Sequence, residues 1–329
     1  MTAPFWLAGT ASGVGSLPGV DPAAAARLVL DELPALPHLA ELPERGTGAD
    51  LVGRSTALLV DLPVDLQPAG WRLVARPGRE LRRTQDLLAR DLDALEEAGQ
   101  GYAGPLKVQA AGPWTLASVV ELTRGDKVLA DASACRDLAA SLGEGLAAQV
   151  TDLRRRLPGI TDLLVQLDEP SLPAVLAGHV RSASGFATLR VPEPAEVEGA
   201  LQAVAAAVTA AGGVPGAHCC ATAPPLATFT AGGARFLSLD VTTLTPRDDD
   251  AVGTALEAGV PLLAGLLPTS GQLPTVAQAL RPLRDLLDRL GATDRAAEVA
   301  VTPTCGLAAA GDARAVLRRA RECAEELVQ

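Results

Sequence analysis

The sequence has few aromatic residues, few lysines and a deficit of positive charge. Phe, Trp and Tyr make up 2% of its 329 residues, so stacking platforms for nucleic-acid bases or sugars are not expected. The formal net charge of −11 argues against a nucleic acid or an anionic membrane as a partner. Lys107 and Lys127 are the only lysines, which leaves little room for Schiff-base chemistry.

Long apolar runs and paired cysteines are also missing. No charge-free apolar stretch reaches the roughly 18 residues of a membrane-spanning helix. The segment Met1–Trp6 has neither the basic region nor the apolar core of a secretory signal. Five cysteines, an odd number scattered through a long chain, do not indicate a disulfide framework. We therefore expect a cytoplasmic protein with reduced thiols and no membrane partner.

Apolar runs alternate with longer amphipathic stretches throughout the chain, as is typical of βα units and a parallel sheet. The eight candidate strands are Thr10–Val14, Thr56–Val60, Leu106–Ala110, Leu163–Leu167, Val214–Ala217, Phe236–Leu239, Pro261–Gly265 and Val299–Thr302. The helical patterns between them are Ala23–Leu33, Leu81–Ala98, Cys135–Arg156, Glu196–Ala211, Ala251–Ala258, Val276–Leu290 and Ala313–Leu327. This count predicts a (β/α)8 TIM barrel, with a doubly wound open sheet as the alternative.

The composition shows no shift that would mark a domain boundary. We therefore predict that residues 1–329 form a single α/β barrel domain with small insertions. The insertions are expected in the first strand-to-helix region and at Ser182–Val191, where a small extra hairpin could form.

The strongest chemical signal is His218-Cys219-Cys220, at the end of an apolar run. In extended backbone His218 and Cys220 point to the same side, and Cys219 points to the other. Cys305, in Thr-Pro-Thr-Cys-Gly, could add a third ligand, and Asp240 a fourth ligand or a neighbour. Nitrogen and sulfur ligands with one exchangeable position favour a catalytic Zn²⁺ site. The alternative is that the cysteines are small buried hydrophobic residues.

Polar residues repeatedly follow the candidate strands, at the carboxyl ends that share one face of a barrel. The sites in question are Gly15-Ser16, Gly112–Thr115, Asp168–Pro170, His218–Cys220, Asp240 and Cys305. Scattered structural cysteines and histidines would not be expected to choose that edge so often. This placement favours the metal site over the packing interpretation.

Other residues near these ends are candidates for binding a substrate. Asp168 ends an apolar strand, where a charge needs a partner, and could pair with an ammonium group or cap the next helix. Gly15 and Ser16 could present N–H groups and a hydroxyl to a carboxylate, or form a plain turn. Glu44 could be a further ammonium partner or an exposed loop charge, and Trp114 could form an apolar wall or part of the core.

The ordered set of motifs resembles the catalytic half of cobalamin-independent methionine synthase, in the uroporphyrinogen-decarboxylase-like group of barrels. The matching pieces are Val14–Pro18, Gly112–Leu116, Gln166–Pro170, His218–Cys220 and Pro303–Leu307. The resemblance implies zinc held by the His-x-Cys pair, an acidic residue one strand later and a late Cys. It also implies that homocysteine binds the zinc as a thiolate and takes a methyl group, with its carboxylate at Gly15-Ser16 and its ammonium at Asp168.

Three departures from the family pattern are visible. The family's zinc carboxylate is Glu, whereas the matching residue here is the shorter Asp240, which leaves its coordination open. The family's proton-delivering His at the end of the seventh strand is absent from Gly265–Pro268. His38 and His179 are interpreted as surface or core residues, although either could replace it. Because the resemblance covers only the catalytic half, we also expect no counterpart of the separate N-terminal barrel of the long methionine synthases, with its contribution to folate binding.

The leading hypothesis is a zinc-dependent methyltransferase that converts homocysteine to methionine. Zinc would deprotonate the bound thiol, whose free pKa near 8.5 to 9 leaves little thiolate at neutral pH. The methyl donor could be a methylated folate, a methyl-corrinoid protein or another small methylated compound. The alternatives are a metal-free decarboxylase of the same barrel group and a barrel that binds zinc or a thiol without turnover.

Overall fold

The computed structural model of the chain describes residues 5–329. Six parallel strands form one sheet in the order β3-β4-β5-β6-β7-β8. These strands are β3 (Gly104–Ala111), β4 (Ile160–Asp168), β5 (Val214–Cys219), β6 (Leu237–Asp240), β7 (Leu262–Leu267) and β8 (Ala300–Pro303). Each predicted strand from Leu106–Ala110 onward overlaps one of them. The α/β class with a parallel sheet is therefore confirmed.

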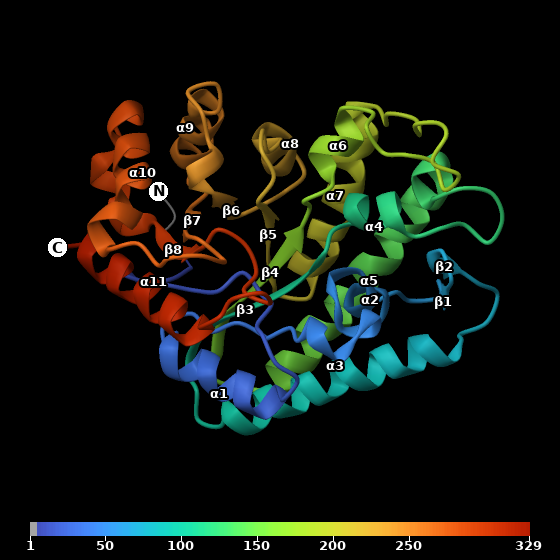
Figure 1. Cartoon of the computed structure of the whole chain (residues 1–329), viewed down its shortest axis with the longest axis horizontal. Coiled ribbons are helices and arrows are strands. Elements are labelled where there is room, and N and C mark those ends of the chain that lie inside the picture. Colours follow the sequence, from blue (N-terminus) through green and yellow to red (C-terminus); the bar gives the residue numbers. More distant parts are fainter. Residues whose placement is uncertain (1–4) are drawn as a thin grey trace.

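Helices surround these strands, as Figure 1 shows. The longer ones are α1 (Pro22–Glu32), α3 (Arg79–Ala98), α5 (Ala132–Arg156), α7 (Pro194–Ala210), α9 (Asp249–Glu257), α10 (Val276–Leu290) and α11 (Ala313–Leu327). The shorter ones are α2 (Leu51–Thr56), α4 (Pro113–Val119), α6 (Leu172–Leu176) and α8 (Leu226–Ala231), with 3-10 turns at Pro43–Arg45, Thr47–Ala49, Val128–Ala130, Val241–Thr243 and Thr293–Glu298. No helix among residues 5–329 is long and apolar enough to cross a membrane.

Two short segments extend the sheet beyond its edge strands without forming regular strands. Ser12 N donates to Val301 O of β8 at 2.9 Å, and Leu39 N donates to Lys107 O of β3 at 2.9 Å. Leu17 N donates to Glu41 O at 2.8 Å, which joins the two segments to each other. The predicted first strand, Thr10–Val14, is therefore reduced to one isolated parallel bridge, between Ala11 and Val301 of β8.

The predicted strand Thr56–Val60 is wrong, because Thr56 ends helix α2 and the following residues form turns. The Asp50 carboxylate accepts a hydrogen bond from Gly53 N at 2.7 Å and so caps this helix. Leu58 and Leu59 are buried, which explains the apolar run. The segment next to β3 is instead the stretch around Leu39, which Pro34 and Pro37 interrupt and which therefore lacks a regular strand pattern.

The extra hairpin lies at β1 (Val64–Gln67) and β2 (Gly70–Leu73), which pair antiparallel. The expected insertion at Ser182–Val191 forms a narrow loop with one antiparallel bridge, between Arg181 and Thr188. The main apolar core runs from Ala11 to Ala324 and includes side chains of most helices. A smaller cluster packs near the amino ends of the strands, leaving the carboxyl ends for polar residues; its members are Trp6, Leu36, Leu164, Phe236, Leu263 and Ala300.

Candidate active site

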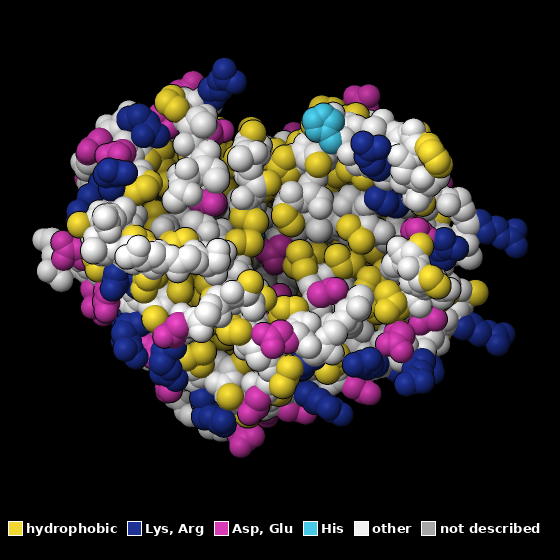
Figure 2. All heavy atoms as spheres, in the orientation of Figure 1, with side chains coloured by type: hydrophobic (Ala, Val, Ile, Leu, Met, Phe, Trp, Pro, Cys, Tyr) yellow, Lys and Arg dark blue, Asp and Glu magenta, His cyan; other side chains and the backbone are white. Residues whose placement is uncertain are grey.

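A pocket of about 260 Å³ opens at the carboxyl ends of the parallel strands. Its lining consists of Val14, Gly15, Ser16, Glu41, Pro43, Leu51, Asp168, Pro170, His218, Cys220, Cys305 and Gly306. Figure 2 shows the central hollow of this face with acidic and hydrophobic side chains in it, while Lys and Arg gather toward the edge. None of the lining residues is a Lys or an Arg.

Three potential metal ligands meet in this pocket. The ligand atoms of His218, Cys220 and Cys305 all lie within 4.8 Å of one another. The Cys220 and Cys305 sulfurs are 3.1 Å apart, and both cysteines are free. His218 belongs to β5, Cys220 follows its last residue, and Cys305 follows β8, so strands far apart in sequence bring the three together. Cys219 is buried, as its place on the opposite side of the strand predicts.

The orientation of His218 makes it suitable as a ligand. Its Nδ1 lies 3.1 Å from Ser238 O and 3.0 Å from Ser238 Oγ. Because a carbonyl oxygen only accepts, the contact with Ser238 O assigns the hydrogen to Nδ1 and leaves a lone pair on Nε2. Nε2 is buried and has no hydrogen-bond partner among the described residues. A buried imidazole nitrogen without a partner, beside two thiols, fits a zinc ion.

The two thiols share their hydrogen bond unequally. The hydrogen bond between the two sulfurs lowers the pKa of Cys305, and the nearby His218 lowers it further. The same contact, together with burial, raises the pKa of Cys220. The lowered pKa of Cys305 favours its thiolate, which is the form in which cysteine binds metals.

Asp240 lies at the end of β6 but outside this group of three ligands. Its Oδ1 accepts hydrogen bonds from Thr242 N at 2.9 Å and Thr242 Oγ1 at 2.6 Å. Burial raises the pKa of Asp240, although the contacts with Thr242 oppose this effect. The carboxylate is therefore held by a neighbouring turn.

Two carboxylates, those of Asp168 and Glu41, belong to the pocket lining. Asp168 ends β4, and its Oδ1 accepts from Gln166 Nε2 at 2.7 Å. Glu41 Oε1 accepts from Gln109 Nε2 at 2.9 Å. Burial raises the pKa of Asp168 to about 7, and the charge of Glu41 adds to this shift. Burial also raises the pKa of Glu41. Two buried carboxylates with this mutual repulsion are poised to receive a cation.

Glu41 was missing from the sequence prediction. Its signal in the sequence is an acidic residue inside the apolar stretch Leu39–Leu42. Placing the second strand at Thr56–Val60 hid that signal, because the stretch was not recognised as part of the sheet. Glu41 N donates to Gly15 O at 3.1 Å, which explains how this residue reaches the pocket.

Gly15 and Ser16 form the edge of the pocket next to Cys305. Leu307 N donates to Ser16 O at 2.8 Å, so the segment after β8 lies directly against this loop. A Cβ on Gly306 would come within 2.1 Å of Ser16 Oγ, so a larger residue there would force the Ser16 hydroxyl to move.

Two other predicted binding residues lie outside the pocket lining. The exposed Glu44 accepts from Gly19 N at 2.9 Å. Trp114 is buried and donates through Nε1 to Val197 O at 3.1 Å, which places it in the packing between α4 and α7. Glu169 is structural, because its carboxylate accepts from Trp114 N at 2.9 Å and Thr115 N at 2.7 Å at the start of α4.

Neither of the remaining histidines lies in the pocket. His38 is buried beside Gly13, where burial and the nearby Lys107 lower its pKa to about 3. An imidazole with this pKa carries no extra proton at neutral pH. His179 is exposed in the loop after α6. Among the described lining residues, His218 is the only histidine.

Comparison with known proteins gives a family and two similar folds. The family described as "Cobalamin-independent synthase, Catalytic domain" matches residues 8–326. The B12-independent methionine synthase of Shewanella sp. W3-18-1, solved in complex with selenomethionine, superimposes with a TM-score of 0.61 at 12% identity, covering 98% of both chains. A Listeria monocytogenes protein described as "Putative Vitamin-B12 Independent Methionine Synthase" gives a TM-score of 0.58 at 14% identity, covering 99% of both chains.

No curated protein matches the sequence significantly. The family match, however, spans nearly the whole chain and includes the strands and loops that form the pocket. The chain belongs to the cobalamin-independent methionine synthase family and is a methionine synthase-like enzyme.

Proposed function

We propose that this protein is a zinc-dependent methyltransferase that methylates the thiol of homocysteine to give methionine. One observation carries the proposal: the ligand atoms of His218, Cys220 and Cys305 converge in a pocket that also presents two carboxylates. The first group suits a metal that binds a thiol, and the second suits an ammonium group. Homocysteine carries both functions.

The donor set favours zinc over harder metals, because two of the three ligands are thiols and the third is an imidazole. Bound there, zinc would deprotonate the substrate thiol and keep its sulfur nucleophilic. Ser238 would fix the ring of His218, and Asp240 would serve as a fourth, displaceable ligand or as a neighbour of the metal. If Asp240 binds the zinc, it would bind weakly, because the metal would have to compete with the two hydrogen bonds from Thr242.

The amino-acid end of the substrate would lie along the part of the pocket lined by Asp168, Glu41, Gly15 and Ser16. Its ammonium would bind between Asp168 and Glu41 and relieve the repulsion between these carboxylates. Its carboxylate would lie at Gly15 and Ser16, on the edge next to Gly306. Glu44 and Trp114 lie outside the lining, so they would act on substrate binding only by supporting the structure around the pocket. The selenomethionine in the Shewanella complex supports binding of a methionine-like product.

In the transfer step the substrate sulfur forms a bond to the methyl carbon, and the bond from that carbon to the donor breaks. The electron pair of the broken bond leaves with the donor. A methylated folate or a methyl-corrinoid protein would both fit this step. A folate would also need a proton on its leaving nitrogen, and the described lining residues offer no imidazole for it besides His218.

We also propose that the molecule is a single domain with a closed (β/α)8 barrel. The bridges of Ala11 with β8 and of His38 with β3, and the bridge between Ser16 and Glu41, support closure of the ring. The core that extends from Ala11 to Ala324 supports a single domain. A decarboxylase of the same barrel group would need a cationic cluster for its carboxylates, and the pocket lining has none.

The test is metal analysis followed by turnover. We expect about one zinc per chain in the purified protein, and loss of most of it in Cys220→Ser and Cys305→Ser. Cys219→Ser is the matched control, because Cys219 is buried on the other side of β5 and should keep the metal. Homocysteine with each methyl donor should then yield methionine.

Unchanged metal uptake in both ligand variants would refute the metal site. Zinc-bound protein that forms no methionine with any donor would instead indicate a binding protein without turnover.

A further inference from the structure

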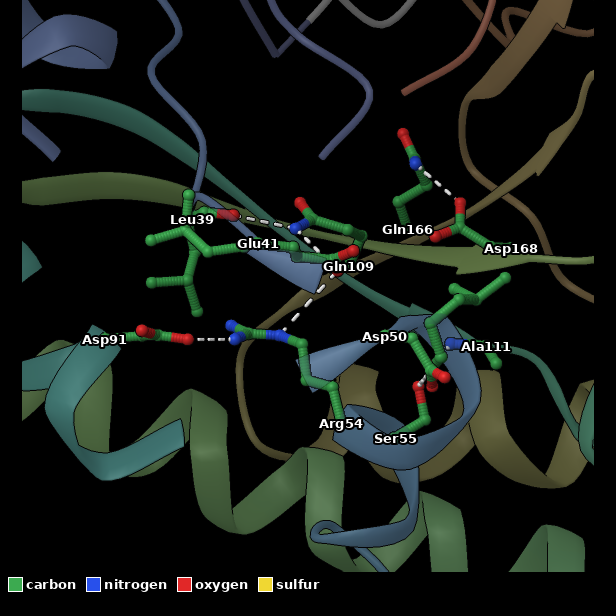
Figure 3. A network of polar contacts seen from close by, with 12 residues as sticks. Leu39, Glu41, Asp50, Arg54, Ser55, Asp91, Gln109, Ala111, Gln166 and Asp168 are labelled. Atoms are coloured by element: carbon green, nitrogen blue, oxygen red, sulfur yellow. Dashed lines mark hydrogen bonds and ion pairs between the residues drawn. The ribbon is translucent and has the colours of Figure 1, made fainter. Parts of the chain in front are cut away.

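A buried arginine lies behind the pocket carboxylate Glu41. Arg54, in helix α2, has a side chain only 4% exposed, and its Nε lies 3.7 Å from Glu41 Oε1. Arg54 is absent from the pocket lining, whereas Glu41 belongs to it. The guanidinium therefore reaches the carboxylate from a residue outside the lining, and Figure 3 shows it between Asp91 and Glu41.

Arg54 is itself held in place by a second buried ion pair. Its Nη1 contacts Asp91 Oδ2 of α3, and the side chain of Asp91 is 2% exposed. Arg45 Nη1 contacts the other oxygen of Asp91 at 2.7 Å. Alternating charges thus extend from α3 to the pocket, and Glu41 is the member that meets the cavity (Figure 3). Gln109 adds a hydrogen bond to Glu41 and also donates to Leu39 O at 2.7 Å.

We propose that Arg54 is a positioning residue that keeps Glu41 charged and aimed into the pocket, and so makes the site selective for thiols that carry an ammonium group. This inference rests on the function proposed above and names what determines substrate choice at that site. The geometry supports it, because a buried carboxylate stays ionised only with a nearby countercharge and hydrogen-bond donors. Among the described residues, Arg54 is the cation in ion-pair contact with Glu41.

Without Arg54 the carboxylate would lose this partner. Lys107 is the next cation, but its Nζ donates to Val14 O at 2.8 Å and to Gln109 Oε1 at 3.2 Å. Desolvation already raises the pKa of Glu41 against the opposing effect of Arg54. A buried carboxylate left without its ion-pair partner takes up a proton or turns away, and either change removes the charge that an ammonium requires.

The experiment compares two thiols in the Co²⁺-substituted protein, where thiolate binding changes the visible absorption spectrum. One ligand is homocysteine, and the other is 4-mercaptobutyrate, which lacks the amino group. For Arg54→Met we expect homocysteine to bind at least tenfold more weakly than to the unmodified protein. The affinity for 4-mercaptobutyrate should change less than twofold. Arg45→Met is the matched control, since Arg45 pairs with the same Asp91, and it should retain the preference for homocysteine.

A second series tests whether Arg54 acts through Glu41, and it includes variants that keep Arg54 or its charge. Glu41→Gln alone should abolish the preference for homocysteine. Adding Arg54→Met to Glu41→Gln should then cause no further loss, because the arginine acts through the carboxylate. Arg54→Lys, which keeps the charge, should restore part of the preference.

Equal loss for both thiols in Arg54→Met, or a further tenfold loss in the double variant, would overturn the inference and leave Arg54 a purely structural residue. Failure of the unmodified protein to bind either thiol at the metal would instead contradict the proposed function. The two failures are therefore distinguishable.

Discussion

At the scale of single residues, the metal ligands of the pocket were easier to predict than the full set of residues that line it. His218, Cys220 and Cys305 stood out because imidazole and thiol groups at strand ends are rare in a chain with 3 histidines and 5 cysteines. Glu41 did not stand out, because the chain has 39 acidic residues and most acidic side chains are solvated. Its role depends on the turn of the chain that brings Gly15 beside it, and residue type alone does not encode that contact.

His38 provides a test of buried charge at the same scale. Burial lowers its pKa to about 3, below the value near 6.5 expected in the unfolded chain. The unfolded state therefore binds more protons below pH 6.5, and stability falls as the pH falls from there toward 3. We expect His38 to lower the free energy of unfolding by about 2 kcal/mol between pH 7 and pH 5.

Urea unfolding at the two pH values measures this effect. His38→Leu should lose that part of the pH dependence, whereas His179→Leu, which removes an exposed histidine, should keep it. An identical pH dependence in the unmodified protein and in His38→Leu would show that His38 is protonated normally in the folded state.

At the scale of helices and strands, prediction succeeded where pattern and capping agree. Helix α10 was predicted with its observed bounds, because its apolar face is periodic and Thr275 forms a capping box with Gln278. The six strands of the sheet were recognisable as apolar runs between helices. Helix α2 was missed because it has only 6 residues and is followed directly by the apolar run after Thr56. A run of that kind cannot be distinguished from a buried strand by periodicity alone.

Helix α4 depends on a carboxylate supplied by another element. Glu169, next to the end of β4, accepts from Trp114 N, Thr115 N and Thr115 Oγ1 at 2.7 to 2.9 Å. Glu169→Gln would place an amide NH₂ against these donors and leave at least one of them unsatisfied. We expect this change to reduce the free energy of unfolding by about 1–3 kcal/mol, as measured by urea denaturation.

Glu193→Gln is the matched control for this change. Glu193 precedes helix α7, is exposed, and makes no side-chain capping bond, so its substitution should have little effect on stability. Equal stability of Glu169→Gln and the unmodified protein would mean that the start of α4 does not need the carboxylate.

At the scale of the whole molecule, the proposed metal site connects distant parts of the chain. Cys220 directly follows β5, and Cys305 lies in the loop after β8, so an ion bound to both would join two regions of the sheet that fold from separate sequence segments. The order of the motifs along the chain predicted this convergence. The strand count predicted a closed barrel, and closure of the ring stays a prediction, because the segments beside β3 and β8 contact the sheet through isolated bridges.

A metal that binds the folded state and not the unfolded chain raises stability in proportion to the logarithm of its free concentration. At a free concentration a thousandfold above the dissociation constant the gain is about 4 kcal/mol. We therefore expect Zn²⁺ to raise the midpoint of thermal unfolding by about 5 °C or more relative to protein with chelator. Cys219→Ser should show the full increase and Cys305→Ser little of it, because Cys305 belongs to the ligand group and Cys219 does not. An equal increase in both variants would mean that the stabilising ion binds elsewhere, and the junction between β5 and the loop after β8 would then be held by packing alone.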